Sequence, residues 1–271
     1  MSVIVFSHAN SFPASTYRVL FKSLRARGFT VKAIEKFGHD PRFPVSNNWP
    51  QVVQQLLEFA QQTVNKTGEP VWLVGHSLGG FLGLMAASRK PELARGVVLV
   101  DSPVLGGWRS TALGVMKSTQ MMGSFSPGAV SRQRRTSWPS VQDAFDHFRN
   151  KKAFAKWDAE VLMDYVTHGT EEIDGKRVLS FDRQVETQFY NSFPDNLERM
   201  LARHPLKCPA SFIGGLASVE VKQIGMAATE RITRGRVTMV DGSHLFPMEK
   251  PLAAAAAIEA ALRNMDTKSP K

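Results

Sequence analysis

The stretch VWLVGHSLGGF, residues 71–81, constrains the fold of this chain more than any other part of the sequence. Four apolar residues lead into GHSLGG, and an apolar run resumes at Phe81. The first run predicts a buried strand, and the run behind the turn predicts a helix. Glycines at the turn let the strand and the helix approach closely. We therefore predict a strand–turn–helix unit that exposes the hydroxyl of Ser77 at its apex, near the positive end of the helix.

Further apolar runs alternate with helical patterns along the chain, and each is nearly continuous in apolar residues. Strands that are buried on both faces have this composition, as in parallel sheets. Strand–helix–strand order implies right-handed crossovers, with helices on both sides of the sheet. The sequence therefore predicts an α/β fold with a mostly parallel sheet of about six strands. The expected strands are residues 3–7, 29–35, 71–75, 96–102, 210–215 and 236–243.

The alternation breaks between Ser102 and about Lys207. We expect residues 1–102 and 207–271 to form the core, and residues 103–206 to form a helical cap. Such a cap would lie over the C-terminal edge of the sheet, where open α/β sheets bind ligands. Its large apolar side chains suggest an apolar acyl pocket, or else the ordinary core of the cap. They are Met116, Met121, Met122, Phe125, Trp138, Phe145 and Trp157.

The chain resembles the α/β-hydrolase fold superfamily, in its serine-nucleophile, esterase- and lipase-like branch with a helical cap. The resemblance rests on FSHAN (6–10), GHSLGG (75–80), the cap insertion and GSHLFPMEKP (242–251), and it covers essentially the whole chain. The first strand begins at residue 3, so two N-terminal strands common in the superfamily are expected to be missing. A serine rather than an aspartate at position 77 argues against halide and epoxide chemistry.

A serine nucleophile needs a base within hydrogen-bond reach. The resemblance implies His244, which follows an apolar strand and precedes the last helix. His76 is expected to pack beside the site, because adjacent residues at a sharp turn point in different directions. His8 is expected to shape the loop after the first strand. No motif surrounds the other candidates in the expected cap, His147, His168 and His204.

The negative charge of a tetrahedral intermediate needs preorganised N–H donors. The resemblance implies the backbone N–H of Leu78, directly after the serine. The second donor comes from the loop after the first strand, where Asn10 is preferred and Ala9 is the alternative.

The acid that would orient His244 is less well defined by the sequence. The superfamily usually places it after the next-to-last strand, and the usual spacing falls near Val219, which cannot serve. Glu220 is the next residue and is the preferred candidate. Some relatives place the acid after the preceding core strand, which makes Asp101 the alternative.

The formal net charge is +10, and its one dense cluster is Arg132, Arg134 and Arg135. This cluster is either a solvated basic face or a site for an anionic substrate or an acidic membrane. We find no nucleic-acid module, metal-ligand spacing, phosphate-binding loop or dinucleotide fingerprint, so no cofactor is expected. We expect neither a signal peptide nor a membrane span, and Cys208 is the only cysteine of the sequence, so we expect a cytoplasmic protein.

These features predict a serine hydrolase that cleaves a small carboxylic ester, with an apolar acyl part, through an acyl-enzyme. An acyl-thioesterase and a carbon–carbon bond hydrolase are alternatives on the same scaffold. A ligand-binding protein without catalysis is a further alternative, because a fold alone does not determine function.

Overall fold

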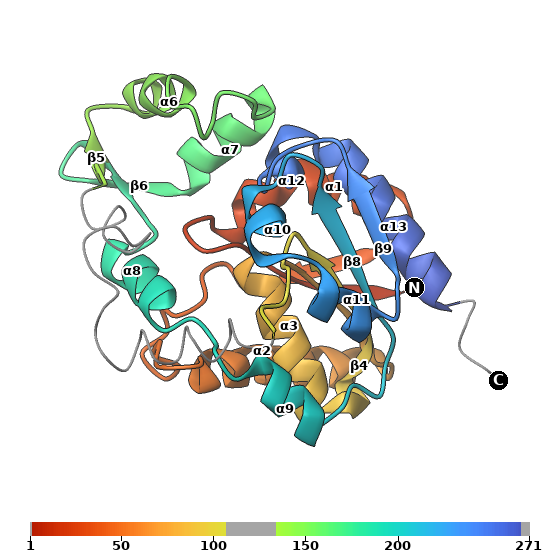
Figure 1. Cartoon of the computed structure of the whole chain (residues 1–271). Coiled ribbons are helices and arrows are strands. Elements are labelled where there is room, and N and C mark those ends of the chain that lie inside the picture. The colour runs from red at the N-terminus through yellow and green to blue at the C-terminus, as the bar shows by residue number, and fades with distance from the viewer. Residues whose placement is uncertain (1, 107–133, 267–271) are drawn as a thin grey trace.

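The computed structural model describes residues 2–106 and 134–266 (Figure 1). Of the side chains expected in a cap pocket, Met116, Met121, Met122 and Phe125 lie outside these ranges. Arg132 of the basic cluster lies outside them as well.

A six-stranded parallel sheet forms the centre of the molecule, in the order β2-β1-β3-β4-β8-β9. The strands are β1 (Val3–Ser7), β2 (Thr30–Ala33), β3 (Val71–His76), β4 (Ala94–Val100), β8 (Ala210–Gly215) and β9 (Val237–Val240). Every residue of β1, β3 and β8 is buried, whereas the edge strands β2 and β9 are partly exposed. The predicted fold class and all six predicted strands are confirmed.

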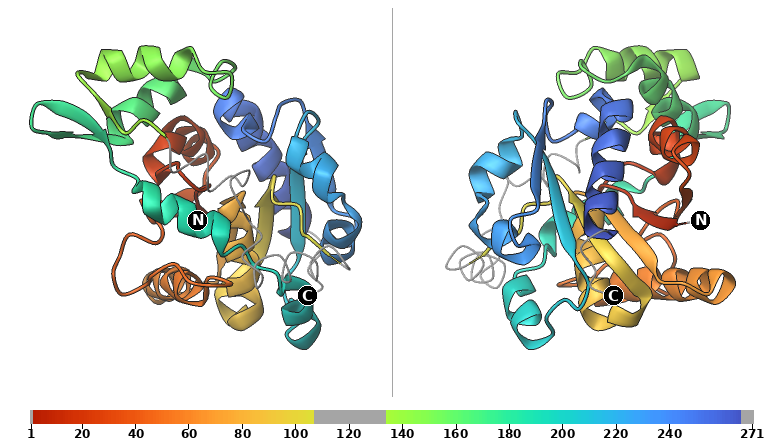
Figure 2. Two further views of the ribbon diagram at one scale, coloured as in Figure 1. Left: turned by 60° about the vertical axis from the view of Figure 1, so that its left-hand side comes forward. Right: turned by 90° about the vertical axis from the view of Figure 1, so that its right-hand side faces the viewer.

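Helices cover both faces of the sheet, and Figure 2 shows the two layers. On one face, α1 (Arg18–Ala26) and α13 (Pro251–Asp266) bury their apolar sides together with the short helices η1 (Ala14–Tyr17) and α12 (Phe246–Glu249). The other face is covered mainly by α2 and α3. Its helices are α2 (Pro50–Thr67), α3 (Leu78–Arg89), η2 (Pro91–Leu93), α9 (Leu197–Arg203), α10 (Val219–Ile224) and α11 (Ala227–Thr233). Among the described helices, none combines the length and apolar character needed to cross a bilayer.

At the C-terminal edge of the sheet, the connection that follows β1 and the connection that follows β3 diverge to opposite faces. Strand β1 pairs with β2 on one side and with β3 on the other. The chain that leaves β1 leads to α1 on one face, whereas the chain that leaves β3 leads to α3 on the opposite face. Ligands bind in open α/β sheets where neighbouring connections diverge in this way. Residues 8–10 and Ser77 lie at this point.

The segment between β4 and β8 adds helices and a small antiparallel sheet, of order β5-β7-β6. Its elements are β5 (Ser137–Trp138), α6 (Val141–Arg149), α7 (Ala159–His168), β6 (Thr170–Ile173), β7 (Lys176–Leu179) and α8 (Arg183–Asn191). Helix α7 packs on η1 and α1, and it lies with α6 beyond the C-terminal edge of the main sheet (Figure 1). Helix α9 instead packs on α3, where the Ser88 hydroxyl donates to the His204 carbonyl over 2.6 Å.

Candidate active site

Ser77 occupies the turn between β3 and α3 in a strained backbone conformation. Its φ is 52° and its ψ is −113°, in a region that non-glycine residues seldom adopt. Such conformations cost about 1–3 kcal/mol and persist only where the surroundings enforce them. Here the Ser77 N–H donates to the Val100 carbonyl over 2.9 Å, and the Ser102 hydroxyl donates to the Ser77 carbonyl over 2.8 Å. These bonds fix the turn against the neighbouring strand.

Glycines around Ser77 are required by the close approach of strand and helix. A Cβ atom on Gly75 would lie 2.1 Å from the carbonyl oxygen of Gly79. A Cβ atom on Gly79 would lie 2.0 Å from the carbonyl oxygen of Ser7, on β1. Neither separation is possible for real atoms, and both clashes are with backbone. The glycines therefore hold α3 against two strands and bring Ser77 to the edge of the sheet.

His244 lies in the loop between β9 and α12, where two carboxylates approach its ring. The Nδ1 atom lies 2.6 Å from Oδ2 of Asp101 and 3.7 Å from Oε2 of Glu220. The Asp101 side chain is fully buried, whereas that of Glu220 is 45% exposed. The geometry thus favours Asp101, the alternative in the sequence, over Glu220, the preferred candidate. Glu220 lies in the first turn of α10, two residues beyond its N-cap Ser218.

Asp101 is positioned by three donors and by its own backbone. Its φ of 47° turns the chain sharply at the end of β4. Oδ1 accepts the Gly215 N–H over 2.8 Å, and Oδ2 accepts the Ser218 hydroxyl over 2.6 Å in addition to His244. Burial alone would raise the pKa of Asp101, but hydrogen bonds from His244, Ser218 and Gly215 outweigh burial and lower it. Asp101 is therefore held as a carboxylate.

The carboxylate in turn determines the state of His244. Burial lowers the pKa of His244, but the hydrogen bond that it donates to Asp101 and the charges of Glu220 and Asp101 raise it above its ordinary value. A neutral ring that donates from Nδ1 to a carboxylate carries its lone pair on Nε2. His244 can therefore accept a proton at Nε2 and is stabilised once it has done so.

Ser77 and His244 line one cavity of about 770 Å³, a size that suits a small-molecule ligand. Its aromatic wall consists of Phe12, Phe81 and Phe193, which belong to the loop after β1, to α3 and to the chain after α8. Further lining residues are Asn10, Asp101, Lys152, Lys156, Tyr190, Glu220 and Leu245.

The predicted cap residues Trp138, Phe145 and Trp157 do not line this cavity. All three pack in a hydrophobic cluster that Phe12 joins, with ring centroids of Phe12 and Trp157 5.4 Å apart. Of the two expectations for these side chains, the ordinary core of the segment is therefore the correct one.

The backbone N–H groups near Ser77 differ in whether they already donate a hydrogen bond within the protein. The Ala9 N–H donates to the hydroxyl of Tyr17 over 3.0 Å, so it is committed. Leu78 begins α3, and the N–H at the start of a helix has no intrahelical acceptor. The backbone N–H of Asn10 has no acceptor among residues 2–106 and 134–266. The Asn10 side chain donates to the Glu186 carbonyl in α8 over 3.0 Å, which fixes its position. The geometry favours Asn10 over Ala9.

Two other histidines near the site are fixed by hydrogen bonds at both ring nitrogens. His8 accepts the Phe37 N–H at Nε2 over 2.9 Å and donates from Nδ1 to the Ala9 carbonyl. Burial, with a smaller effect of His39, lowers the pKa of His8 to about 4, so it is neutral and shapes the loop as expected. His76 contacts Tyr17 and the backbone of His244, and burial lowers its pKa to about 3.

Asp101, Glu220 and His244 are the one group in the described chain whose donor atoms could surround a metal ion, because those atoms lie within 4.8 Å of one another. However, the 2.6 Å contact between Nδ1 and Oδ2 is a hydrogen bond, which a bound cation would have to replace. We therefore treat these residues as a hydrogen-bonded cluster.

The two described members of the basic cluster differ, because Arg134 is largely buried whereas Arg135 is exposed. Arg134 turns inward, pairs with Glu186 over 3.1 Å and donates to the hydroxyl of Tyr165. Burial lowers the pKa of Arg134, but Tyr165 and Glu186 more than compensate and raise it. Arg135 donates to the carbonyl of Ser137. The sequence missed this because charge alone does not show which way a side chain turns.

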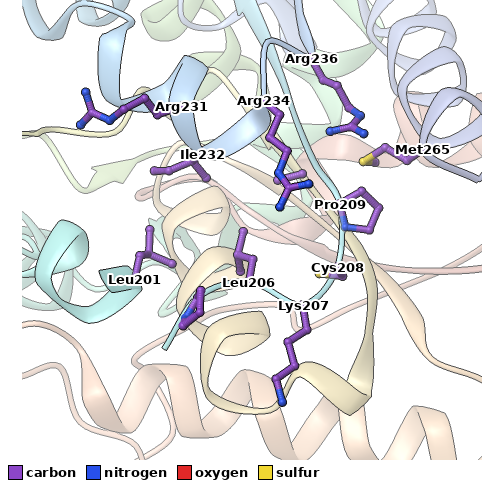
Figure 3. Close-up of a pocket in the computed structure, with 12 residues that line it drawn as sticks. Leu201, Leu206, Lys207, Cys208, Pro209, Arg231, Ile232, Arg234, Arg236 and Met265 are labelled. Atoms are coloured by element: carbon purple, nitrogen blue, oxygen red, sulfur yellow. The ribbon is translucent and has the colours of Figure 1, made fainter. Parts of the chain in front are cut away.

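A second cavity of about 460 Å³ lies at the opposite edge of the sheet, where β8 begins (Figure 3). Arg234 and Arg236 extend toward Pro209, whereas Lys207 points away from it. Among the described residues, neither a serine nor a histidine lines this cavity, and burial raises the pKa of its one thiol, Cys208, to about 11. Ser77 and His244 instead meet in the first cavity.

Comparison with known proteins places the chain in a family. A model of the alpha/beta hydrolase family matches residues 4–258. A monoglyceride lipase homolog of monkeypox virus is 22% identical over 170 residues, which are 57% of this chain and 60% of that protein. The monoglyceride lipase of Rattus norvegicus is 26% identical over 115 residues, or 41% of this chain and 38% of that protein. The chain thus spans less than two thirds of the length of the curated relatives it matches.

Solved structures share the fold at low sequence identity. E-2-(acetamidomethylene)succinate hydrolase superposes with a TM-score of 0.71 at 20% identity, over 97% of this chain and 91% of that one. The thioesterase domain from the curacin biosynthetic pathway superposes with a TM-score of 0.68 at 18% identity, over 95% of this chain and 90% of that one. At these identities the likeness extends to the fold alone.

Proposed function

This chain belongs to the alpha/beta hydrolase family, and on that premise we propose that it cleaves a carboxylic ester through an acyl-enzyme formed on Ser77. The observation that carries the proposal is the meeting of Ser77, at a strained strand–helix turn, with His244 in one cavity. His244 is bonded to a buried carboxylate, which leaves Nε2 as a base.

In the proposed mechanism, Nε2 of His244 takes the proton of the Ser77 hydroxyl while the oxygen attacks the ester carbonyl. The backbone N–H groups of Leu78 and Asn10 stabilise the resulting oxyanion. Protonated His244 then gives its proton to the departing alcohol. A water molecule, activated by the same nitrogen, attacks the acyl-enzyme and releases the acid. We assign Asp101 rather than Glu220 as the acid, supported by the shorter distance and the deeper burial of Asp101.

The aromatic wall of the cavity supports an apolar acyl group as the ligand. Two similar proteins are monoglyceride lipases by name, so a monoacylglycerol is the first natural ester to test. A thioester of an anionic carrier is a second candidate, because Lys152 and Lys156 lie in the lining of the cavity. We propose that part of residues 103–206 acts as the cap, since the carbonyl of Glu186 in α8 contacts Asn10 beside the site.

A fluorophosphonate label and a panel of p-nitrophenyl esters and acyl-thioesters of graded length test the proposal. The wild-type protein should be labelled at Ser77 and should hydrolyse at least one ester, whereas Ser77→Ala should do neither. Ser23→Ala, on α1 and outside the lining of the cavity, is the matched control and should behave as the wild type. A wild-type protein that is unlabelled and as inert as Ser77→Ala across the panel would refute it.

A further inference from the structure

A chain of buried hydrogen bonds joins three segments of the candidate site. The Ala9 N–H lies 3.0 Å from the hydroxyl oxygen of Tyr17. That oxygen lies 2.7 Å from Nδ1 of His76, and Nε2 of His76 lies 2.9 Å from the carbonyl oxygen of His244. Tyr17 and His76 are almost completely inaccessible to solvent. Water therefore does not compete for these bonds.

The direction of every bond in this chain follows from its two ends. The Ala9 N–H can only donate, so the oxygen of Tyr17 accepts from it. At the other end the His244 carbonyl can only accept, so His76 carries a proton on Nε2 and donates it there. The low pKa of His76 leaves Nδ1 without a proton, so Nδ1 accepts the one proton of the Tyr17 hydroxyl. One tautomer satisfies all of these groups.

These hydrogen bonds keep the same proton positions over the whole physiological pH range. Burial, together with the nearby His244, lowers the pKa of His76 to about 3. Burial also raises the pKa of Tyr17 far above its ordinary value. Neither group gains or loses a proton near neutral pH, so the connection is structural and permanent rather than a proton relay.

Each end of the chain belongs to a segment that the mechanism uses. Ala9 precedes Asn10, the proposed second oxyanion donor, and His76 directly precedes Ser77. At the other end, His76 donates to the backbone carbonyl of His244, while Asp101 accepts a hydrogen bond from the ring of the same residue. Since the Ala9 N–H donates to the hydroxyl of Tyr17, Asn10 is the better placed of the two candidate donors, Ala9 and Asn10.

We propose that Tyr17 and His76 are positioning residues that hold the oxyanion loop and the backbone of His244 in register with Ser77. This inference rests on the proposed function. Its prediction is that loss of the Tyr17 hydroxyl slows the chemical step while substrate binding is retained, because neither residue lines the cavity.

Tyr17→Phe tests this directly. The ring of Tyr17 packs against Phe6 and Phe21, with centroids 4.8 and 6.1 Å away, so phenylalanine keeps the packing and removes only the hydroxyl. We expect kcat for a short p-nitrophenyl ester to fall about 10- to 100-fold, with KM within about twofold. Phe21→Leu is the matched control, because it weakens the same packing without touching the chain of bonds. It should lower the melting temperature and leave kcat within about twofold of wild type.

A pair of His76 variants gives an independent measurement. Glutamine offers one acceptor and one donor in place of the two ring nitrogens, whereas leucine offers neither. We expect His76→Gln to retain at least about tenfold more kcat than His76→Leu, with fluorophosphonate labelling of Ser77 following the same order.

The outcomes separate this inference from the proposed function. If the wild type takes the label at Ser77 but kcat of Tyr17→Phe falls no further than that of Phe21→Leu, the positioning role is wrong and the hydrolase stands. Equal kcat in the two His76 variants, or a loss seen only in KM, also overturns it. A wild-type protein that takes no label overturns the proposed function and this inference with it.

Discussion

Replacing Asp101 with asparagine should separate the two candidate acids, because the structure gives them very different contacts with His244. In the wild-type protein, Oδ1 of Asp101 accepts the Gly215 N–H over 2.8 Å, and Oδ1 of the asparagine in Asp101→Asn can still do so. The amide NH₂ group then stands where Oδ2 accepted the Ser218 hydroxyl and Nδ1 of His244. The Ser218 hydroxyl can rotate to accept this donor. His244 must instead put its lone pair on Nδ1 and its proton on Nε2, so the ring can no longer act as a base.

Wrong-tautomer variants of such triads lose about 10⁴ in kcat, or roughly 5.5 kcal/mol of transition-state stabilisation. We expect a loss of about 10³–10⁴ for Asp101→Asn. Glu220→Gln removes a charge 3.7 Å from Nδ1, but the side chain is 45% exposed and solvent screens it, so we expect a loss below about tenfold.

Initial rates with p-nitrophenyl butyrate, at a temperature well below both melting transitions, give kcat for the two variants. Thermal unfolding is measured alongside, because the altered hydrogen bonds of Asp101→Asn should cost about 1–3 kcal/mol of stability. If Asp101→Asn stays within tenfold of wild type and Glu220→Gln loses a hundredfold or more, Glu220 is the acid and the distance-based reasoning fails.

Three further predictions follow from the same geometry. Because the pKa of His244 is raised and its neutral form is the base, kcat/KM should rise with pH through a midpoint above the ordinary 6.5, and a midpoint at or below 6 contradicts this. Gly79→Ala should lower the melting temperature far more than Gly175→Ala, because a Cβ at 79 meets the backbone of Ser7, whereas one at 175 meets nothing within 4 Å and only strains a positive φ. Comparable melting temperatures would argue against the close approach. Phe193→Ala should raise KM for p-nitrophenyl octanoate about tenfold and leave the acetate unchanged, and equal shifts for both esters would remove Phe193 from the acyl wall.

The strands and the turn at Ser77 could be predicted because local sequence determines them. Continuous apolar runs give buried strands wherever they occur, and the glycines of GHSLGG are needed by contacts within the turn and its nearest strand. The acid depends instead on where separate loops meet. Asp101, Ser218 and His244 come from the ends of three different strands, and the spacing along any one loop does not report their distances.

The segment between β4 and β8 was predicted less completely. The sequence predicts only a helical cap there, whereas the structure also has a three-stranded sheet whose hairpin carries a clear signal. Asp174 and Gly175, both with positive φ, connect Ile173 and Lys176, and Asp-Gly is a common two-residue hairpin turn. The sequence offers the large Met, Phe and Trp side chains of this segment as a pocket, but Phe81 and Phe193, which are not in that set, line the cavity. Composition identifies apolar residues but does not tell which surface they face.

The backbone angles at Ser77 and Asp101 have a consequence for how such a chain evolves. Both residues have φ near +50°, a conformation that glycine adopts without strain. Glycine at Ser77 would relieve local strain, and the folded protein would lose only a side chain that the fold does not use. Under the proposed function, selection for stability alone would favour that change, whereas selection for turnover would oppose it.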